Sequence, residues 1–233
     1  MDERFIREEM LIGKEAMEML NGARVALFGV GGVGAAVAEG LARGGVGAID
    51  LIDNDTVSIT NVNRQLCALE STIGLPKVDA VAKRLLDINP KLKIEKHQIF
   101  FLPDTELDFS VYDYIVDAID TVSAKVEIAK RAAEQGVRMI SCMGTGNKLD
   151  PTALVVTDLQ KTSVCPLARV MRRELKARGI THLKVVYSTE EPRKVYVEDR
   201  HGKHPPASIS FVPTTAGFIA AGEVIRDIIG IVR

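Results

Sequence analysis

The stretch that most constrains the fold is a glycine-rich turn within residues 25–43. Residues 25–28 are apolar, and Gly29, Gly31 and Gly34 follow at a fixed spacing before a run of small residues that is typical of a helix. This pattern predicts a strand, a tight turn and a helix whose first N–H groups can hold a phosphate. A Cβ atom in such a turn would block the approach of a phosphate or of the helix to the sheet. The turn therefore indicates a nucleotide, without deciding which one.

Strand and helix patterns alternate through the first 142 residues. Apolar or alternating runs predict strands at residues 25–28, 48–52, 93–98, 114–117 and 137–142. Helical patterns occupy residues 4–20, with Gly13 as a candidate break, and residues 32–43, 76–87 and 121–135. This alternation predicts an α/β fold with a doubly wound, mostly parallel Rossmann-like sheet. Ligands bind such sheets at the carboxyl ends of the strands.

The pattern changes after residue 147. Strands are expected at residues 153–157, 183–187 and 207–212, helices at 166–178 and 214–229, and a polar loop at 200–206. We expect these elements to form a carboxy-terminal extension of mixed strands and helices. Residues 1–233 are interpreted as a single domain, with a nucleotide-binding half over about residues 1–150.

Charge and cysteine content exclude several classes of protein. The net charge is −1, so a nucleic-acid partner would need a local basic patch. The three cysteines, Cys67, Cys142 and Cys165, form no Cys-x-x-Cys pair, which excludes a disulfide framework and a four-cysteine zinc site. The charged N-terminus and the short apolar runs predict no signal segment and no membrane span. A cytoplasmic location fits best.

Charged residues after the strands discriminate between nucleotides. Asp53 lies 19 residues beyond the last of the three glycines, which formally allows NAD. Arg64 and Lys77, however, place cations near the turn, as a triphosphate requires. Asp117 and Asp120 follow a later strand, where carboxylates could hold Mg²⁺ on the phosphates. No Gly-x-x-x-x-Gly-Lys-Ser/Thr motif is present, so this is not an ordinary P-loop ATPase.

Five motifs in this order resemble the superfamily of ubiquitin-activating, ThiF and MoeB proteins. They are the glycine turn at 29–34, Asp53-x-Asp55-x-Val57, Thr60-Asn61-Val62-Asn63-Arg64-Gln65, Gly74-x-x-Lys77 and Asp117-x-x-Asp120. The resemblance covers about residues 1–150 and implies ATP-dependent adenylation of a carboxylate.

The resemblance also implies roles for individual residues. The ATP ligands would be Gly29, Gly31, Gly32, Gly34, Asp53, Asn61, Arg64 and Lys77. Arg64, Lys77 and Asp120 would act in catalysis, with Asp120 supporting Mg²⁺ on the ATP. Arg7 resembles an arginine that reaches the ATP of the partner subunit, which would require a homodimer. Each of these has a plainer interpretation as a surface charge or a turn residue.

The carboxy-terminal half resembles one branch of this superfamily, the tRNA threonylcarbamoyladenosine dehydratases. Residues 187–192 and 208–217 carry this resemblance, and the paired Cys-x-x-Cys zinc motif of the sulfur-carrier branch is missing, so no zinc is expected. The branch implies a carboxylate on a modified adenosine of tRNA. Its adenylation would release pyrophosphate, and ring closure would then expel AMP with net loss of water. That second step is intramolecular and requires no protein nucleophile. Cys165 remains a candidate catalytic cysteine, beside a plainer role in packing.

A basic helix face offers a route to tRNA. Arg169, Arg172, Arg173 and Lys176 lie on one side of the helix predicted at residues 166–178. Such a strip neutralises phosphates, although a solvated helix face has the same appearance. With this strip, about residues 151–233 are interpreted as the half that faces substrate and tRNA.

Three alternatives stay open at this point. The chain could adenylate the C-terminal carboxylate of a ubiquitin-like sulfur carrier, or it could be an NAD-dependent oxidoreductase. It could also be a catalytically idle nucleotide-binding scaffold. A sulfur-transfer protein is a further candidate partner.

Overall fold

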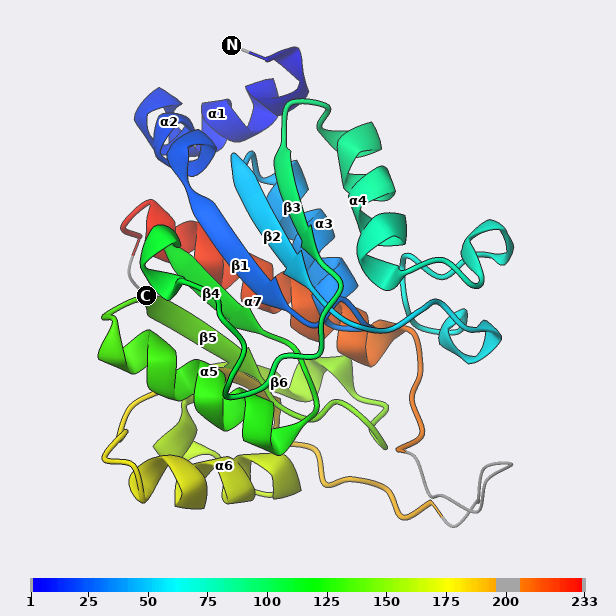
Figure 1. Cartoon of the computed structure of the whole chain (residues 1–233), viewed down its shortest axis with the longest axis vertical. Coiled ribbons are helices and arrows are strands. Elements are labelled where there is room, and N and C mark those ends of the chain that lie inside the picture. Colours follow the sequence, from blue (N-terminus) through cyan, green and yellow to red (C-terminus); the bar gives the residue numbers. More distant parts are fainter. Residues whose placement is uncertain (1, 196–205, 232–233) are drawn as a thin grey trace.

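The computed structural model describes residues 2–195 and 206–231 and contains one seven-stranded sheet in the order β3-β2-β1-β4-β5-β7-β6 (Figure 1). The strands are β1 (Arg24–Phe28), β2 (Ala48–Ile52), β3 (Lys93–His97), β4 (Tyr114–Asp117), β5 (Arg138–Cys142), β6 (Leu154–Asp158) and β7 (Lys184–Ser188). All neighbouring strands are parallel except β6 and β7, which pair antiparallel. The predicted mostly parallel α/β sheet is confirmed.

Helices cover both faces of this sheet. They are α1 (Ile6–Ile12), α2 (Lys14–Gly22), α3 (Gly34–Arg43), α4 (Lys77–Ile88), α5 (Val122–Glu134), α6 (Pro166–Lys176) and α7 (Phe211–Ile228). Buried side chains of α3, α4 and α7 share one apolar core with the sheet, whereas those of α5 and α6 belong to two other clusters. The connection from β1 leads to β2 on one side, and β4 lies on the other, so the strand order reverses between β1 and β4. Doubly wound sheets bind ligands at this point.

At the amino-terminal end the helix breaks at the predicted candidate, Gly13, whereas at the carboxy-terminal end one predicted strand is wrong. The helix predicted at residues 4–20 is divided into α1 and α2 by Gly13, whose φ of 87° suits glycine. The strand predicted at 207–212 is wrong, because residues 206–209 form no strand and α7 begins at Phe211. Pro213 lies in the first turn of α7, where its missing N–H costs no helical hydrogen bond. Most of the polar loop predicted at 200–206 lies outside the described residues.

Small residues allow α7 to pack closely on α3. A Cβ atom on Gly217 would lie 2.3 Å from the carbonyl oxygen of Val33, and one on Gly40 would lie 2.6 Å from the Cβ atom of Ala221. This close contact brings the start of α7 to the glycine turn, where a Cβ on Gly32 would be 3.3 Å from Pro213. The carboxy-terminal segment therefore reaches the carboxyl ends of the strands beside the glycine turn. Within the described residues, no helix has the length and apolarity required to cross a membrane.

Candidate functional site

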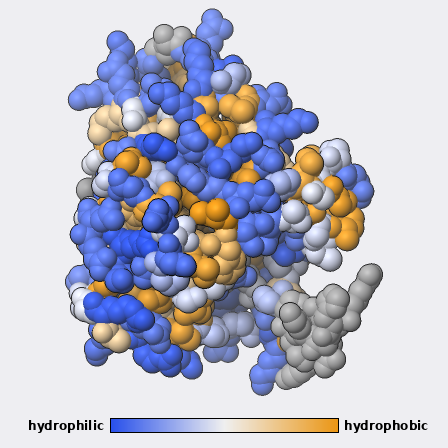
Figure 2. All heavy atoms as spheres, in the orientation of Figure 1, coloured by the Kyte–Doolittle hydropathy of each residue, from blue (hydrophilic) through white to orange (hydrophobic). Residues whose placement is uncertain are grey.

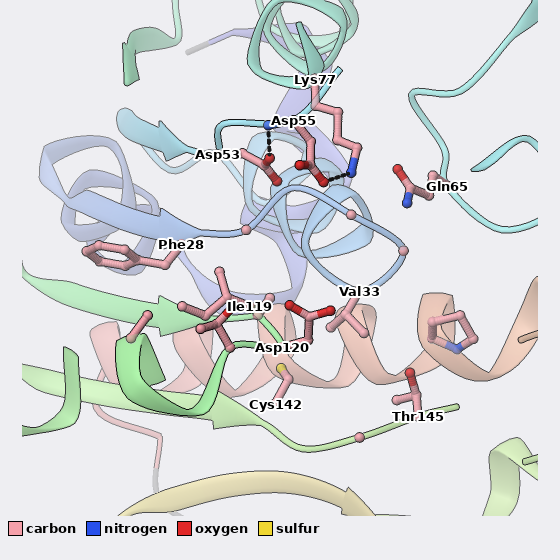
Figure 3. A pocket seen from close by; sticks show the side chains of 18 of the residues that line it. Phe28, Val33, Asp53, Asp55, Gln65, Lys77, Ile119, Asp120, Cys142 and Thr145 are labelled. Carbon is pink, nitrogen blue, oxygen red and sulfur yellow. Dashed lines mark hydrogen bonds and ion pairs between the residues drawn. The ribbon is translucent and has the colours of Figure 1, made fainter. Parts of the chain in front are cut away.

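A cavity of about 430 Å³ lies at the carboxyl ends of the strands, at the reversal of strand order. Its walls come from the turn after β1, the segment after β2, the start of α4 and the ends of β4 and β5. In Figure 3, Asp53, Asp55 and Lys77 lie on one side of the glycine turn, and Asp120 and Cys142 lie on the other. Sequence reasoning predicted this convergence of charged connections, and the structure confirms it.

The glycines of the turn serve two different purposes. Gly29 has a φ of 84°, and a Cβ there would lie 2.8 Å from Ile119; a Cβ on Gly34 would lie 1.8 Å from the carbonyl oxygen of Gly29. These two glycines permit close packing of the turn. Gly31 also lines the cavity, and the nearest atom to a Cβ there would be 3.7 Å away, on Gln65. Gly31 therefore leaves room for a ligand at the N-terminal end of α3.

Asp53 holds the turn in place from the end of β2. Its Oδ2 atom accepts a hydrogen bond from the backbone N–H of Val30 at 2.8 Å, and its Oδ1 atom accepts one from the N–H of Asp55 at 2.8 Å. A carboxylate oxygen can accept more than one hydrogen bond, so both oxygens of Asp53 can still accept hydrogen bonds from the hydroxyl groups of a ligand.

Two cations line the cavity from the segment between β2 and α4. Lys77 is only 6% exposed, and its Nζ atom lies 2.7 Å from Oδ2 of Asp55. Arg64 is half-buried and donates through Nη1 to the carbonyl oxygen of Thr60 at 2.8 Å and to Oδ1 of Asn63 at 3.0 Å. Both cations are thus held at the cavity by neighbouring residues of the same connection.

Two buried amides accompany these cations. Asn61 accepts the backbone N–H of Ser58 at 3.0 Å through Oδ1, which fixes the short helical turn that carries it. Gln65 is 7% exposed, and its Oε1 atom is the one buried side-chain N or O atom, among the described residues, without a hydrogen-bond partner. A buried acceptor without a partner is unfavourable, so this atom is suited to accept a hydrogen bond from a ligand or water. Sequence reasoning did not single out Gln65, although it directly follows Arg64 in the quoted motif.

The two aspartates after β4 have different surroundings. Asp120 is exposed and lines the cavity. Asp117 is fully buried, 2.8 Å from the Nζ atom of Lys125 and 2.5 Å from the hydroxyl of Ser141. The suggestion that Asp117 helps to hold Mg²⁺ is therefore wrong, since its carboxylate is enclosed by protein groups. No group of three or more His, Cys, Asp or Glu side chains among residues 2–195 and 206–231 could hold a metal ion.

Neither Arg7 nor Cys165 is among the residues that line the cavity of their own chain. Arg7 is exposed on α1. Cys165 is 3% exposed and belongs to the apolar core beneath α6. Cys142 does line the cavity, but burial raises the pKa of its thiol to about 12, so the thiol stays protonated at neutral pH. The geometry presents no activated cysteine to the cavity.

The basic face of α6 is smaller than its sequence indicates. Arg169, Arg173 and Lys176 are exposed, with Arg173 paired to Glu174 at 2.8 Å. Arg172 is half-buried and donates to the carbonyl oxygen of Thr162 at 3.0 Å and to its hydroxyl. Arg172 therefore fastens α6 to the preceding turn.

The family model described as "ThiF family" matches residues 5–232. The chain belongs to the ThiF family. It is 44% identical to the tRNA threonylcarbamoyladenosine dehydratase of Bacillus subtilis (strain 168), over 97% of this chain and 94% of that one. A crystal structure of E. coli tRNA N6-threonylcarbamoyladenosine dehydratase in complex with ATP superposes with a TM-score of 0.86 at 33% identity, and covers 97% of this chain and 94% of its own. The AMP complex of the same enzyme gives 0.87 at 33% identity and the same coverage.

Proposed function

We propose that this chain catalyses the ATP-dependent dehydration of threonylcarbamoyladenosine in tRNA. The cavity carries the proposal: cations and carboxylates from three βα connections surround a glycine turn, as the adenylation of a carboxylate requires. The 44% identity to a Bacillus subtilis dehydratase over nearly the whole chain supports the choice of substrate.

ATP fits the residues that line the cavity. Its phosphates would lie over Gly31 at the start of α3, and its ribose hydroxyls would donate to Asp53. Arg64 and Lys77 would contact the phosphates, beside Asn61 and Gly32. Mg²⁺ fits the oxygen donors that Asp120 and the phosphates offer, and when bound it withdraws charge from the phosphates.

The reaction proceeds in two steps. A carboxylate oxygen of the threonyl group attacks the α-phosphorus of ATP, the bond to the β-phosphate oxygen breaks, and pyrophosphate leaves. A group of the same modified side chain then attacks the acyl carbon and loses a proton, which closes the ring as AMP departs. Lys77 and Arg64 stabilise the negative charge that shifts onto the departing pyrophosphate. Asp120, which lines the cavity, would hold Mg²⁺ beside the phosphates and the reacting carboxylate.

The two halves of the chain take separate parts in this proposal. Residues 1–150, approximately, supply the ATP ligands, and the half from about residue 151 to 233 faces the tRNA within the same domain, although Ser208 and Pro213 of that half also line the cavity. The exposed cations Arg169, Arg173 and Lys176 contact tRNA phosphates. Arg172 has a structural role instead, since its side chain donates a hydrogen bond to the carbonyl oxygen of Thr162. The substrates meet in the cytoplasm, where we place the reaction.

We further propose a homodimer in which Arg7 reaches the phosphates of the partner's ATP. Arg7 lies on α1 next to Ile6, Met10 and Leu11, which are 48%, 82% and 84% exposed. A second group of exposed apolar side chains lies on the segment that connects β2 to α4, which projects at the right of the molecule (Figures 1 and 2). Its exposed members are Ile59, Val62, Leu69, Ile73 and Leu75. Exposed apolar side chains at this density favour an interface. Cys165 has no part in the proposal, because it is buried away from the cavity.

Mass analysis of tRNA nucleosides tests the function. Incubation with ATP, Mg²⁺ and tRNA that bears threonylcarbamoyladenosine should remove one water from that nucleoside and release pyrophosphate. The Asp120→Ala protein is the control and should leave the nucleoside intact. Pyrophosphate release with a carrier protein that ends in Gly-Gly, and none with tRNA, would favour the sulfur-carrier alternative. Thermal stabilisation by NAD but not by ATP with Mg²⁺ would favour the oxidoreductase.

A further inference from the structure

A fully buried lysine lies beneath the floor of the cavity. Lys125 of α5 is 0% exposed, and its Nζ atom is 2.8 Å from Oδ2 of Asp117. The same atom donates to the carbonyl oxygen of Ile119 at 3.1 Å and to that of Cys142 at 2.9 Å. An ammonium group has three protons, and these three acceptors use all of them. One cation thus joins the carboxyl ends of the neighbouring strands β4 and β5.

Asp117 and Ser141 complete this arrangement. Oδ2 of Asp117 also accepts the hydroxyl of Ser141 at 2.5 Å, and its Oδ1 accepts the backbone N–H of Ile119 at 3.3 Å. Both Asp117 and Ser141 are 0% exposed. We call Lys125, Asp117 and Ser141 the floor triad. Its hydrogen bonds link the ends of β4 and β5, and its three residues are not among those that line the cavity.

Stability alone is a weak reason for such a buried pair. Removing two charges from water is so unfavourable that apolar side chains of similar volume often give an equally stable or more stable protein. The surroundings suit apolar side chains, since Ile115, Val116 and Ile140 are also completely buried. The floor triad instead fixes the orientation of two backbone carbonyl groups, those of Ile119 and Cys142, by hydrogen bonds; apolar contacts, which are not directional, would let them shift.

Those two carbonyl groups precede the segments that face the reacting atoms. Ile119 is followed by Asp120, and Cys142 is followed by residues 143–146; both segments line the cavity. Within the described part of the chain, the Asp120 carboxylate makes no hydrogen bond or ion pair, so its place depends on the backbone that carries it. Figure 3 shows Ile119, Asp120 and Cys142 together below the glycine turn.

We propose that the floor triad positions Asp120 and residues 143–146 for the adenylation step. This inference rests on the proposed function, which assigns Asp120 to the reacting carboxylate. The floor triad acts through the backbone and touches no substrate. Its loss should therefore lower the rate of adenylation and leave ATP binding, which depends on the glycine turn and Lys77, largely unchanged.

The test replaces the charged pair by uncharged side chains of similar size. The Lys125→Met/Asp117→Asn protein should release pyrophosphate with a kcat at least about tenfold below the parent, with KM and Kd for ATP within about threefold. Lys130→Met is the matched control, since Lys130 lies on the same helix with a 41% exposed side chain. It should keep the parent kcat.

Ser141→Ala provides a second variant that changes no charge and decides the matter if the double variant does not fold. It should lower kcat at least about threefold without weakening ATP binding. Parent-like kcat in either folded variant overturns the inference, as does a parallel loss of kcat and ATP affinity, which indicates a general structural role. The parent, measured in the same assay, separates the two failures: a parent inactive on modified tRNA refutes the proposed function and the inference with it.

Discussion

The Nζ atom of Lys77 lies 2.7 Å from Oδ2 of Asp55, and the two side chains differ sharply in exposure: 7% for the lysine and 58% for the aspartate. The aspartate neutralises a buried cation that the proposed reaction assigns to the phosphates of ATP. A triphosphate carries more negative charge than one carboxylate, so it can displace Asp55 from Lys77 when it binds. Asp55 then competes with the ligand for the same cation.

Changes at the two members of this pair should therefore have opposite effects. Lys77→Met should raise the Kd for ATP at least about tenfold, because a charge-assisted hydrogen bond is lost. Asp55→Asn should lower that Kd by about twofold to fivefold, because a like charge beside the phosphates is removed. Calorimetric titration with ATP and Mg²⁺ measures both. Lys83→Met, at an exposed position of the same helix, is the control. Weaker binding by Asp55→Asn would show that Asp55 orients Lys77 for the ligand.

Replacement of Cys165 tests whether the reaction needs a thiol. Cys165→Ala should keep the parent kcat for pyrophosphate release, because this cysteine is buried in the core under α6 and does not line the cavity. The loss of one buried sulfur should lower the free energy of unfolding by about 1 kcal/mol. A fall in kcat of a hundredfold in a protein with near-parent stability would instead assign Cys165 to catalysis.

Most of the sheet could be predicted from the sequence, because buried parallel strands and amphipathic helices have different apolar periods. The place of Asp53, Lys77 and Asp120 around one cavity follows from the same alternation, since each residue succeeds a strand whose carboxyl end meets the others. Local pattern and global fold agree in these elements.

The features that sequence reasoning missed depend on contacts between distant segments. Residues 208–212 alternate like a strand, but close packing of Gly217 on α3 holds the chain that begins at Phe211 as a helix. The charge of Arg172 gives no sign that Thr162 holds it. The burial of Gln65 and of Lys125 likewise arises only when the segments come together.

A buried carboxylate on β2, the strand next to the edge strand β3, predicts acid sensitivity. Burial alone would raise the pKa of Asp50, but hydrogen bonds from Arg24, His97 and Tyr112 outweigh it and hold the pKa below the ordinary value of 3.8. Because the pKa is depressed in the folded state, the stabilisation is present above about pH 4 and is lost as the pH falls through the folded-state value.

Asp50→Asn should therefore lower the free energy of unfolding at pH 7 by about 2 kcal/mol. The difference from the parent should shrink between about pH 4 and pH 2, as the parent carboxylate becomes protonated. Denaturant titration across this range measures both effects. The exposed residue Asp104 gives a control variant, Asp104→Asn, that should follow the parent at every pH. A difference that persists unchanged at pH 2 would contradict the prediction.

The basic face of α6 predicts a salt-dependent interaction with tRNA. Arg169→Glu/Arg173→Glu should weaken tRNA binding. It should also make the slope of the logarithm of the tRNA-binding constant against the logarithm of the salt concentration less steep by about 1 to 2, since each lost phosphate contact removes about 0.7 to 0.9 from that slope. Lys130→Glu on α5 is the matched charge reversal outside this face. An unchanged slope would remove α6 from the tRNA interface. Arg172→Glu is unsuitable for this test, because it disturbs the contact with Thr162.

If Arg7 acts in the active site of the partner subunit, two inactive variants should complement each other and restore activity when they form mixed dimers. In a symmetric dimer whose sites each take Arg7 from one chain and Lys77 from the other, Arg7→Ala and Lys77→Ala homodimers both lack intact sites. Mixed dimers have one site with both defects and one site with none. After unfolding and joint refolding at equal amounts, half of the dimers are mixed, so activity should return to about a quarter of the parent level.

Two controls separate this mechanism from simpler ones. Refolding each variant alone should restore no activity. Leu11→Asp places a charge on the exposed apolar face of α1, so it should lower the fraction of dimer in sedimentation experiments and abolish the recovery of activity in the mixture. If Arg7 acts only within its own chain, the two defects divide between the sites of a mixed dimer and no intact site forms. Absence of recovery in a mixture that sediments as dimers would therefore exclude action of Arg7 across the interface.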